Sequence, residues 1–90
     1  MRRERKIFSG RSNPELAKKI AISADCQLGD ISIKTFSDGE IWVKYEENVR
    51  GQDVFIIQST NGPSENIIEL ALMTDAAVRA SASTVNIIMP

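Results

Sequence analysis

Apolar residues in the first third of the chain recur at helical spacing, after a short apolar start at Ile7-Phe8. These helical positions are Leu16, Ala17, Ile20, Ala21 and Ala24. Asn13 offers a capping side chain, and Pro14 suits the first helical position. The pattern therefore predicts a strand at Ile7-Phe8, and a helix that begins at Asn13-Pro14.

The middle of the chain changes to the two-residue period of a β-strand. Residues 31–36 alternate between apolar and polar side chains, and residues 41–45 do so again after a break at Asp38-Gly39. Two such runs joined by a short turn predict a projecting β-hairpin, an arm over about residues 31–46. Trp42 falls on the opposite face from the apolar residues, where it either makes a protein contact or packs onto the domain.

The second half returns to a strand, a helix and a strand. Residues 54–57 are continuously apolar, which is typical of a strand covered on both faces. Ser64 is placed to cap a helix whose apolar positions extend around much of its girth, so we expect that helix to be well buried. Those positions are Ile67, Ile68, Leu70, Ala71, Leu72, Met73, Ala76 and Ala77. Residues 85–89 are predicted to form a doubly buried strand, and the lack of a later helix to cover it indicates truncation.

Alternation of strands and helices predicts an α/β fold with a parallel sheet and flanking helices. The 90 residues are enough for one small domain or part of one. The charged start, residues 2–6, is interpreted as a solvated tail.

Composition narrows the classes of function. A net charge of −1 gives no electrostatic reason to propose nucleic acid or an anionic membrane as partner. No apolar run reaches the roughly 20 residues of a membrane span, and the N-terminus lacks the apolar region of a secretion signal. A single cysteine, Cys26, fits a reducing cytoplasm. The absence of histidine excludes a Ser-His-Asp triad and a histidine-based metal site within this sequence.

Three loops are candidates for chemistry, because ligands of open α/β sheets collect at the carboxyl ends of the strands. Residues 9–13 join a strand to a helix N-terminus, which can bind anions through backbone amides. They lack a recognised phosphate-binding pattern, and helix capping alone is sufficient to explain them. Residues 59–63 are similar, and loop chemistry is sufficient for them. The third loop holds Phe36, Asp38, Gly39 and Glu40. Its aromatic ring could stack on a base and its carboxylates could accept hydrogen bonds, although Ser-Asp-Gly is also ordinary turn chemistry.

Four segments, taken in order and spacing, closely resemble the start of ribose-phosphate pyrophosphokinase, the family also called phosphoribosyl pyrophosphate synthetase. They are KIFSGRSNPELA at 6–17, FSDGE at 36–40, ENVRGQDVFIIQS at 47–59 and RASAS at 79–83. The resemblance runs from about Lys6 to Pro90, and the chain stops just before the family's aromatic-Ala-Arg-Gln-Asp segment. It implies that residues 1–90 are part of an N-terminal phosphoribosyltransferase-like domain with the arm at about 31–46.

The resemblance also implies roles for individual residues. In such enzymes the aromatic and acidic positions of the turn, here Phe36, Asp38 and Glu40, hold the adenine of ATP and reach into the active site of a neighbouring subunit. A second set resembles positions near a phosphate-binding regulatory site: Asn48, Arg50, Ser81 and Ser83. Without the resemblance, Arg50 would be an ordinary surface charge, and Ser81 and Ser83 would be an ordinary helix cap.

Complete enzymes of the family transfer diphosphate from ATP to ribose 5-phosphate with magnesium, and they are homo-oligomers. The resemblance implies that the catalytic residues and the magnesium ligands lie beyond Pro90, so this chain alone is expected to be inactive. Two other interpretations stay open. The chain could be a non-catalytic relative that acts as a binding or regulatory module, or a half-domain that folds and self-associates.

Overall fold

The structure, a computed structural model, describes residues 4–89. Its elements are, in order, β1 (Arg5–Ser9), α1 (Pro14–Ser23), β2 (Ile31–Thr35), β3 (Ile41–Tyr45), β4 (Asp53–Ile57), α2 (Glu65–Arg79) and β5 (Thr84–Ile88). The strands β1, β4 and β5 form a parallel sheet in the order β1-β4-β5, and β2 and β3 pair as an antiparallel hairpin. The predicted α/β fold with a parallel sheet and a hairpin is confirmed.

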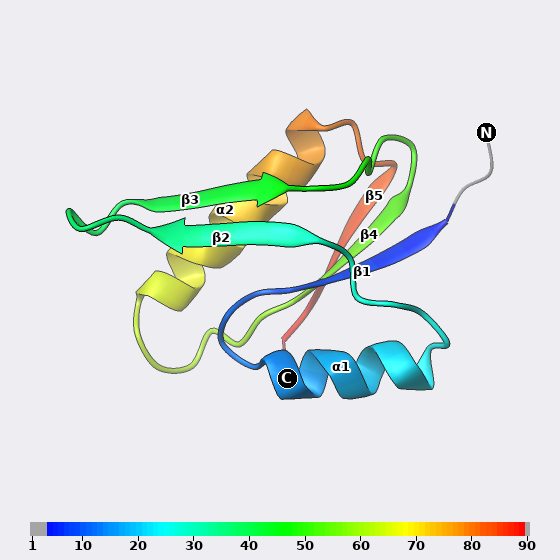
Figure 1. Ribbon diagram of the computed structural model, residues 1–90, viewed down its shortest axis with the longest axis horizontal. Helices are drawn as coiled ribbons and strands as arrows, with labels where there is room; N and C mark the ends of the chain where they lie inside the picture. Colours follow the sequence, from blue (N-terminus) through cyan, green and yellow to red (C-terminus); the bar gives the residue numbers. More distant parts are fainter. Residues whose placement is uncertain (1–3, 90) are drawn as a thin grey trace.

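The parallel sheet is covered by a different layer on each face (Figure 1). On one face, Ala17 and Ala21 of α1 join Ile7 and Ile57 in a buried cluster. On the other face, α2 and the hairpin pack over β1 and β4. Because β4 lies between β1 and β5 with a layer on each side, the continuously apolar run 54–57 is the expected sequence for it.

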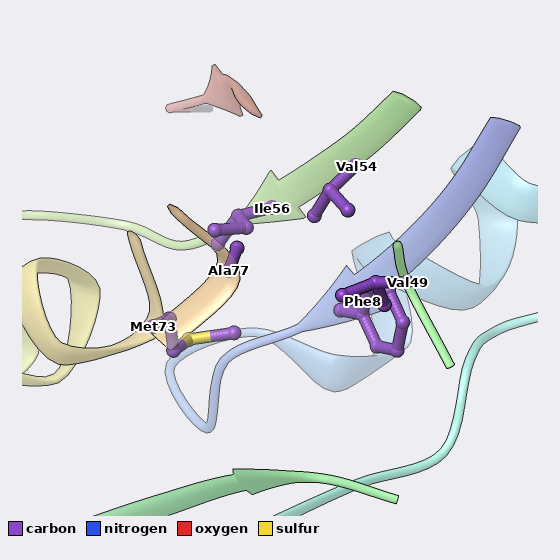
Figure 2. Close-up of a cluster of buried hydrophobic side chains, with 6 residues drawn as sticks. All are labelled: Phe8, Val49, Val54, Ile56, Met73 and Ala77. Atoms are coloured by element: carbon purple, nitrogen blue, oxygen red, sulfur yellow. The ribbon is translucent and has the colours of Figure 1, made fainter. Parts of the chain in front are cut away.

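The larger core lies between the sheet, α2 and the inner face of the hairpin (Figure 2). Its buried members are Phe8, Val49, Val54, Ile56, Met73 and Ala77. Tyr45 of β3 meets the ring of Phe8 edge-on, with centroids 4.7 Å apart, and its hydroxyl donates to the carbonyl of Met73 at 2.7 Å. Burial raises the pKa of the Tyr45 hydroxyl, so this donor keeps its proton. The inner face of the hairpin is therefore fastened to α2.

The first strand begins earlier than the sequence pattern predicted. Arg5 and Lys6 belong to β1, so the prediction of a solvated tail is wrong for them, and residues 2 and 3 lie outside the described part. Lys6 Nζ lies 2.8 Å from Glu47 Oε1, and Glu47 Oε2 accepts from the Asp30 amide at 2.8 Å. These contacts join β1 to the segments just before β2 and just after β3, at the base of the hairpin. They also hold the pKa of the Glu47 carboxyl below its ordinary value, the Lys6 hydrogen bond contributing most.

The two predicted helix caps have different outcomes. The Asn13 side chain accepts from the Leu16 amide at 3.2 Å, which confirms the N-cap of α1. The Ser64 prediction is wrong, because Ser64 already has right-handed helical dihedrals and its side chain makes no cap hydrogen bond. A side-chain cap requires a non-helical backbone at that residue, so α2 begins through its backbone alone.

The expectation that α2 is well buried is also wrong. Glu69, Met73 and Ala77 are its buried residues, one helical turn apart. Ile67 and Val78 are 54% and 60% exposed. The helix contacts the sheet and the hairpin along one narrow stripe, so the apolar residues beside that stripe face solvent.

The last strand, β5, is an edge strand that pairs with β4 alone within residues 4–89. Ile87 is 44% exposed. The predicted double burial of this strand is therefore wrong in this structure, because α2 covers only part of its face. A groove of about 530 Å³ runs between α2 and β5, and its apolar lining includes Ile67, Val78 and Ile87.

Candidate functional site

The turn at the hairpin tip is closed by its own backbone and held in one shape. The Phe36 amide donates to the Glu40 carbonyl at 2.8 Å, and the Gly39 amide donates to the Phe36 carbonyl at 2.9 Å. Gly39 has a φ of 87°, in the region that favours glycine, and no heavy atom lies within 4 Å of where a Cβ would be. Glycine is therefore required here by the backbone and not by space.

The predicted adenine-binding residues lie together at this tip, pointing away from the core. Phe36 is 50% exposed, although it is a large apolar residue. Asp38 accepts from the Glu40 amide at 3.0 Å. Within residues 4–89 the Glu40 carboxylate has no hydrogen-bond or ion-pair partner. The structure thus brings one aromatic face and two carboxylates onto one exposed turn, at the end of the arm that extends beyond α2 (Figure 1).

Trp42 lies on the outer face of the hairpin, opposite the face that packs on α2. It pairs in register with Lys34, and Lys34 Nζ lies 5.3 Å from the centre of its ring. It is 38% exposed, so packing onto the domain is the wrong interpretation. The ring and the ammonium group form an exposed cation–π pair next to the tip.

The second predicted set lies on two loops that the fold brings together at the opposite end of the sheet from the tip. The Gly51 amide donates to the Ser81 carbonyl at 2.9 Å, and the Ser83 amide donates to the Gln52 carbonyl at 2.8 Å. The two loops therefore carry the four candidates, Asn48, Arg50, Ser81 and Ser83, close to one another. The side chain of Asn48 already accepts from the Arg50 amide at 3.0 Å.

A buried polar network that the sequence analysis missed lies at the carboxyl end of β1 and β4. Glu69 is 2% exposed and Gln58 is fully buried. Glu69 accepts from the Arg11 amide at 2.7 Å, from Arg11 Nε at 2.6 Å and from Gln58 Nε2 at 2.9 Å. Gln58 Oε1 in turn accepts from the Ser12 hydroxyl at 2.6 Å. A glutamate within the otherwise apolar run 67–73 was the one available signal.

This network decides between the two interpretations of residues 9–13. The amides of Arg11 and Ser12 donate to Glu69 and Gln58 instead of pointing at open solvent. A Cβ added to Gly10 would lie 2.0 Å from Gln58 Oε1, so the loop is closed tightly over its own acceptors. The structure therefore favours the structural interpretation of this loop over anion binding.

Residues 59–63 likewise bond within the domain. The Ser59 amide donates to the Ser12 hydroxyl at 2.8 Å, and Asn61 bonds to both Ser59 and Asn66. Among residues 4–89 no three carboxylate or thiol side chains lie together as a metal site. No helix in that range is both long enough and apolar enough to cross a bilayer.

Comparisons with known proteins show the family of the chain. Residues 5–90 match the family described as the N-terminal domain of ribose phosphate pyrophosphokinase. The chain is 57% identical over 86 residues to a ribose-phosphate pyrophosphokinase of Fusobacterium nucleatum, and 56% identical over 86 residues to that of Bacillus subtilis. Each alignment covers 94% of this chain and 27% of the relative, so the chain spans about a quarter of their length.

A solved structure shows the same fold. The crystal structure of phosphoribosylpyrophosphate synthetase from Mycobacterium smegmatis superposes with a TM-score of 0.93 at 36% sequence identity. The superposition covers 98% of this chain and 30% of that one.

Proposed function

The chain belongs to the ribose-phosphate pyrophosphokinase family as its N-terminal domain, and we propose that it supplies the ATP-binding arm of such an enzyme. The complete enzyme would transfer the β,γ-diphosphoryl group of ATP to the 1-hydroxyl of ribose 5-phosphate. The oxygen of that hydroxyl forms the new bond to the β-phosphorus, its proton is released, and AMP leaves. The product is phosphoribosyl pyrophosphate, a precursor in nucleotide biosynthesis.

The observation that carries this proposal is the exposed tip formed by Phe36, Asp38 and Glu40. A half-exposed phenylalanine contributes little to folding, whereas its open face suits a planar base. Stacking on a base contributes about 1–3 kcal/mol in other proteins. The two carboxylates flanking it can accept hydrogen bonds from the exocyclic amine of adenine. These three residues therefore serve the nucleotide, on this proposal, and not the core.

The same geometry supports the proposal of a homo-oligomer. Binding sites for small molecules bury most of their ligand, typically about 70–90% of its surface. A single convex turn offers one face to a base, so a second surface must enclose the other side. The family resemblance supplies that surface as the active site of a neighbouring subunit, and this is the assembly that we propose.

The chemistry of transfer is assigned to parts of the enzyme outside residues 4–89. Phosphoryl transfer depends on positioning and on charge neutralisation, which magnesium provides when bound. The family resemblance implies that the magnesium ligands lie in those other parts as well. We therefore expect the 90-residue chain alone to show no turnover. We place the enzyme in the cytoplasm, where the free thiol of Cys26 is in keeping with a reducing environment.

A regulatory phosphate site at Asn48, Arg50, Ser81 and Ser83 is a second proposal. Its support is the pairing of the two loops through Gly51 and Gln52, which places the loop of Arg50 beside the loop of Ser81 and Ser83. Arg50→Met in the complete enzyme should remove any effect of added phosphate on the rate while leaving the basal rate unchanged.

Steady-state kinetics of Phe36→Ala in the complete enzyme test the proposed role of the tip. The KM for ATP should rise about 5- to 150-fold, which corresponds to the stacking energy given above. The melting temperature should stay close to that of the parent. Phe36→Tyr keeps an aromatic face and should restore most of the affinity, and Ser37→Ala in the same turn is the matched control. A large loss of stability with an unchanged KM would make Phe36 a structural residue.

A further inference from the structure

The guanidinium of Arg11 joins the buried network to the hairpin. Its Nε donates to Glu69 Oε1 at 2.6 Å, and its Nη2 donates to Thr35 Oγ1 at 2.8 Å. Thr35 is the last residue of β2 and directly precedes Phe36. We propose that Arg11 is a positioning residue, which fixes the tip end of the hairpin relative to the carboxyl edge of the parallel sheet. Its consequence for ATP rests on the function proposed above.

The anchor at one end of this bridge is rigid. Glu69 is 2% exposed and accepts from three donors at once. Gln58, one of the three, is also held by Ser12 and by the carbonyl of Asn66. A Cβ at position 10 would lie 2.0 Å from Gln58 Oε1, so the backbone of Gly10 lies directly against this amide. A carboxylate fixed in this way can hold a guanidinium in one orientation, because both groups are planar and the pairing is directional.

The hairpin has little other support at its tip end. Its inner apolar residues, Ile31, Ile33, Val43 and Tyr45, pack against the core, and Glu47 pairs with Lys6 at its base. A hollow of about 320 Å³ lies between the β1–α1 loop and β2. Arg11 lines this hollow together with Ile31 and Ile33. Among the hydrogen bonds within residues 4–89 that join the hairpin to the rest of the domain, the bond to Thr35 lies nearest the tip.

This placement has a mechanical consequence. A two-stranded ribbon is marginally stable without packing, so its end would bend about the last packed residues if nothing held it. Binding a nucleotide would then require the tip to be ordered, at a cost in affinity. Arg11 removes part of that cost before binding, because it fixes the residue next to Phe36. Lysine cannot replace it, since one ammonium group lacks the rigid fork that reaches both Glu69 and Thr35.

Hydrogen exchange measured by mass spectrometry on the complete enzyme tests the bridge without reference to activity. Thr35→Val removes the acceptor and leaves the Arg11–Glu69 pair intact, while Arg11→Met and Arg11→Lys remove the bridge from the other side. In all three we expect amides of residues 36–42 to exchange about 3- to 10-fold faster, as expected for the loss of one hydrogen bond. Thr35→Ser should restore the slow exchange.

Arg79→Met is the matched control. Arg79 Nε also binds a carboxylate, that of Asp75 at 2.9 Å, but on the exposed side of α2 and away from the arm. It should leave exchange in the arm unchanged. Unchanged exchange in both Thr35→Val and Arg11→Met would overturn the inference.

Kinetics separate this inference from the proposed function. The KM for ATP should rise about 3- to 10-fold in Thr35→Val, with the KM for ribose 5-phosphate unchanged and with recovery in Thr35→Ser. Faster exchange with an unchanged KM for ATP would support the anchoring role and count against nucleotide binding at the tip. An equal rise in both KM values would overturn the specific role of Arg11 in positioning the tip.

Discussion

Replacing Glu69 by glutamine removes one acceptor from a place where every partner is a donor. Glu69 Oε2 receives the Arg11 amide and Gln58 Nε2, and Oε1 receives Arg11 Nε. A glutamine has one oxygen, so its amide nitrogen must face a donor in either orientation. The better orientation keeps the oxygen where the two neutral donors meet, and it turns the NH₂ group toward the guanidinium.

The loss in free energy of unfolding depends on whether the group left without a partner can reach water. An unsatisfied buried polar group costs about 1–3 kcal/mol. The Arg11 side chain is 44% exposed and can turn partly into solvent, so we expect the lower part of that range, about 1–2 kcal/mol. A domain of this size has about 4–13 kcal/mol of total stability. The substitution therefore removes a large share without unfolding the domain.

Urea unfolding of the 90-residue chain, followed by far-ultraviolet circular dichroism at one fixed protein concentration, measures this cost. With a slope of about 1 kcal/mol per molar urea, the midpoint should fall by about 1–2 M. Glu65→Gln is the matched control, because it makes the same change at an exposed position in the first turn of the same helix. It should cost about 0.3–0.5 kcal/mol through the helix dipole. Equal shifts in the two variants would refute the argument that Glu69 holds a buried network.

Two further predictions come from the base of the hairpin and from the groove beside α2. Because the Lys6 hydrogen bond holds the pKa of the Glu47 carboxyl below its ordinary value, the unfolded state takes up the proton first, and stability is lost as pH falls through the folded value. Between about pH 6 and about pH 3, the urea midpoint of Glu47→Gln should therefore fall less than that of the parent, and Glu15→Gln is the control. Parallel curves of urea midpoint against pH for the parent and Glu47→Gln would contradict this. The 90-residue chain alone should self-associate, because Ile67, Val78 and Ile87 line an exposed groove of the kind that marks contact surfaces. A molar mass of 10.0 kDa at every concentration in sedimentation equilibrium would contradict self-association.

Structural features that depend on one local property of the sequence were predicted well. Apolar residues at every second position, first at Ile31 and Ile33 and then in 41–45, predicted the hairpin, since that period fits a ribbon with one packed face. The continuously apolar run at β4 predicted a central strand for the same kind of reason. Asn13 predicted a cap because the capping geometry is local.

Features that depend on distant parts of the chain were missed. Glu69 has the pattern of a surface charge, and its burial depends on Gln58 and Arg11, which come from two other loops. Ser64 was a suitable residue for a cap, but the preceding loop sets its backbone in a helical conformation. The narrow buried stripe of α2 depends on how far the sheet and the hairpin extend beneath it, which periodicity does not encode.

The candidate site was predicted unevenly. The resemblance supplied the residues Phe36, Asp38 and Glu40, and the alternation placed them at a turn. Their shared exposure and their fixed turn come from the structure. Arg11, which lies far from them in sequence, had no signal that linked it to the arm, because its two partners are brought together only by the fold.

Shortening the tip tests the central claim most directly. Residues 36–40 can be replaced by Asn-Gly in the complete enzyme, since a two-residue turn of that type joins paired strands and Thr35 already pairs with Ile41. Formation of AMP from ATP and ribose 5-phosphate is then measured against ATP concentration, with the melting temperature as the check on folding. The account predicts a folded protein whose KM for ATP rises at least about 5-fold, or whose turnover is lost. Unchanged turnover and an unchanged KM for ATP in the shortened protein would contradict it.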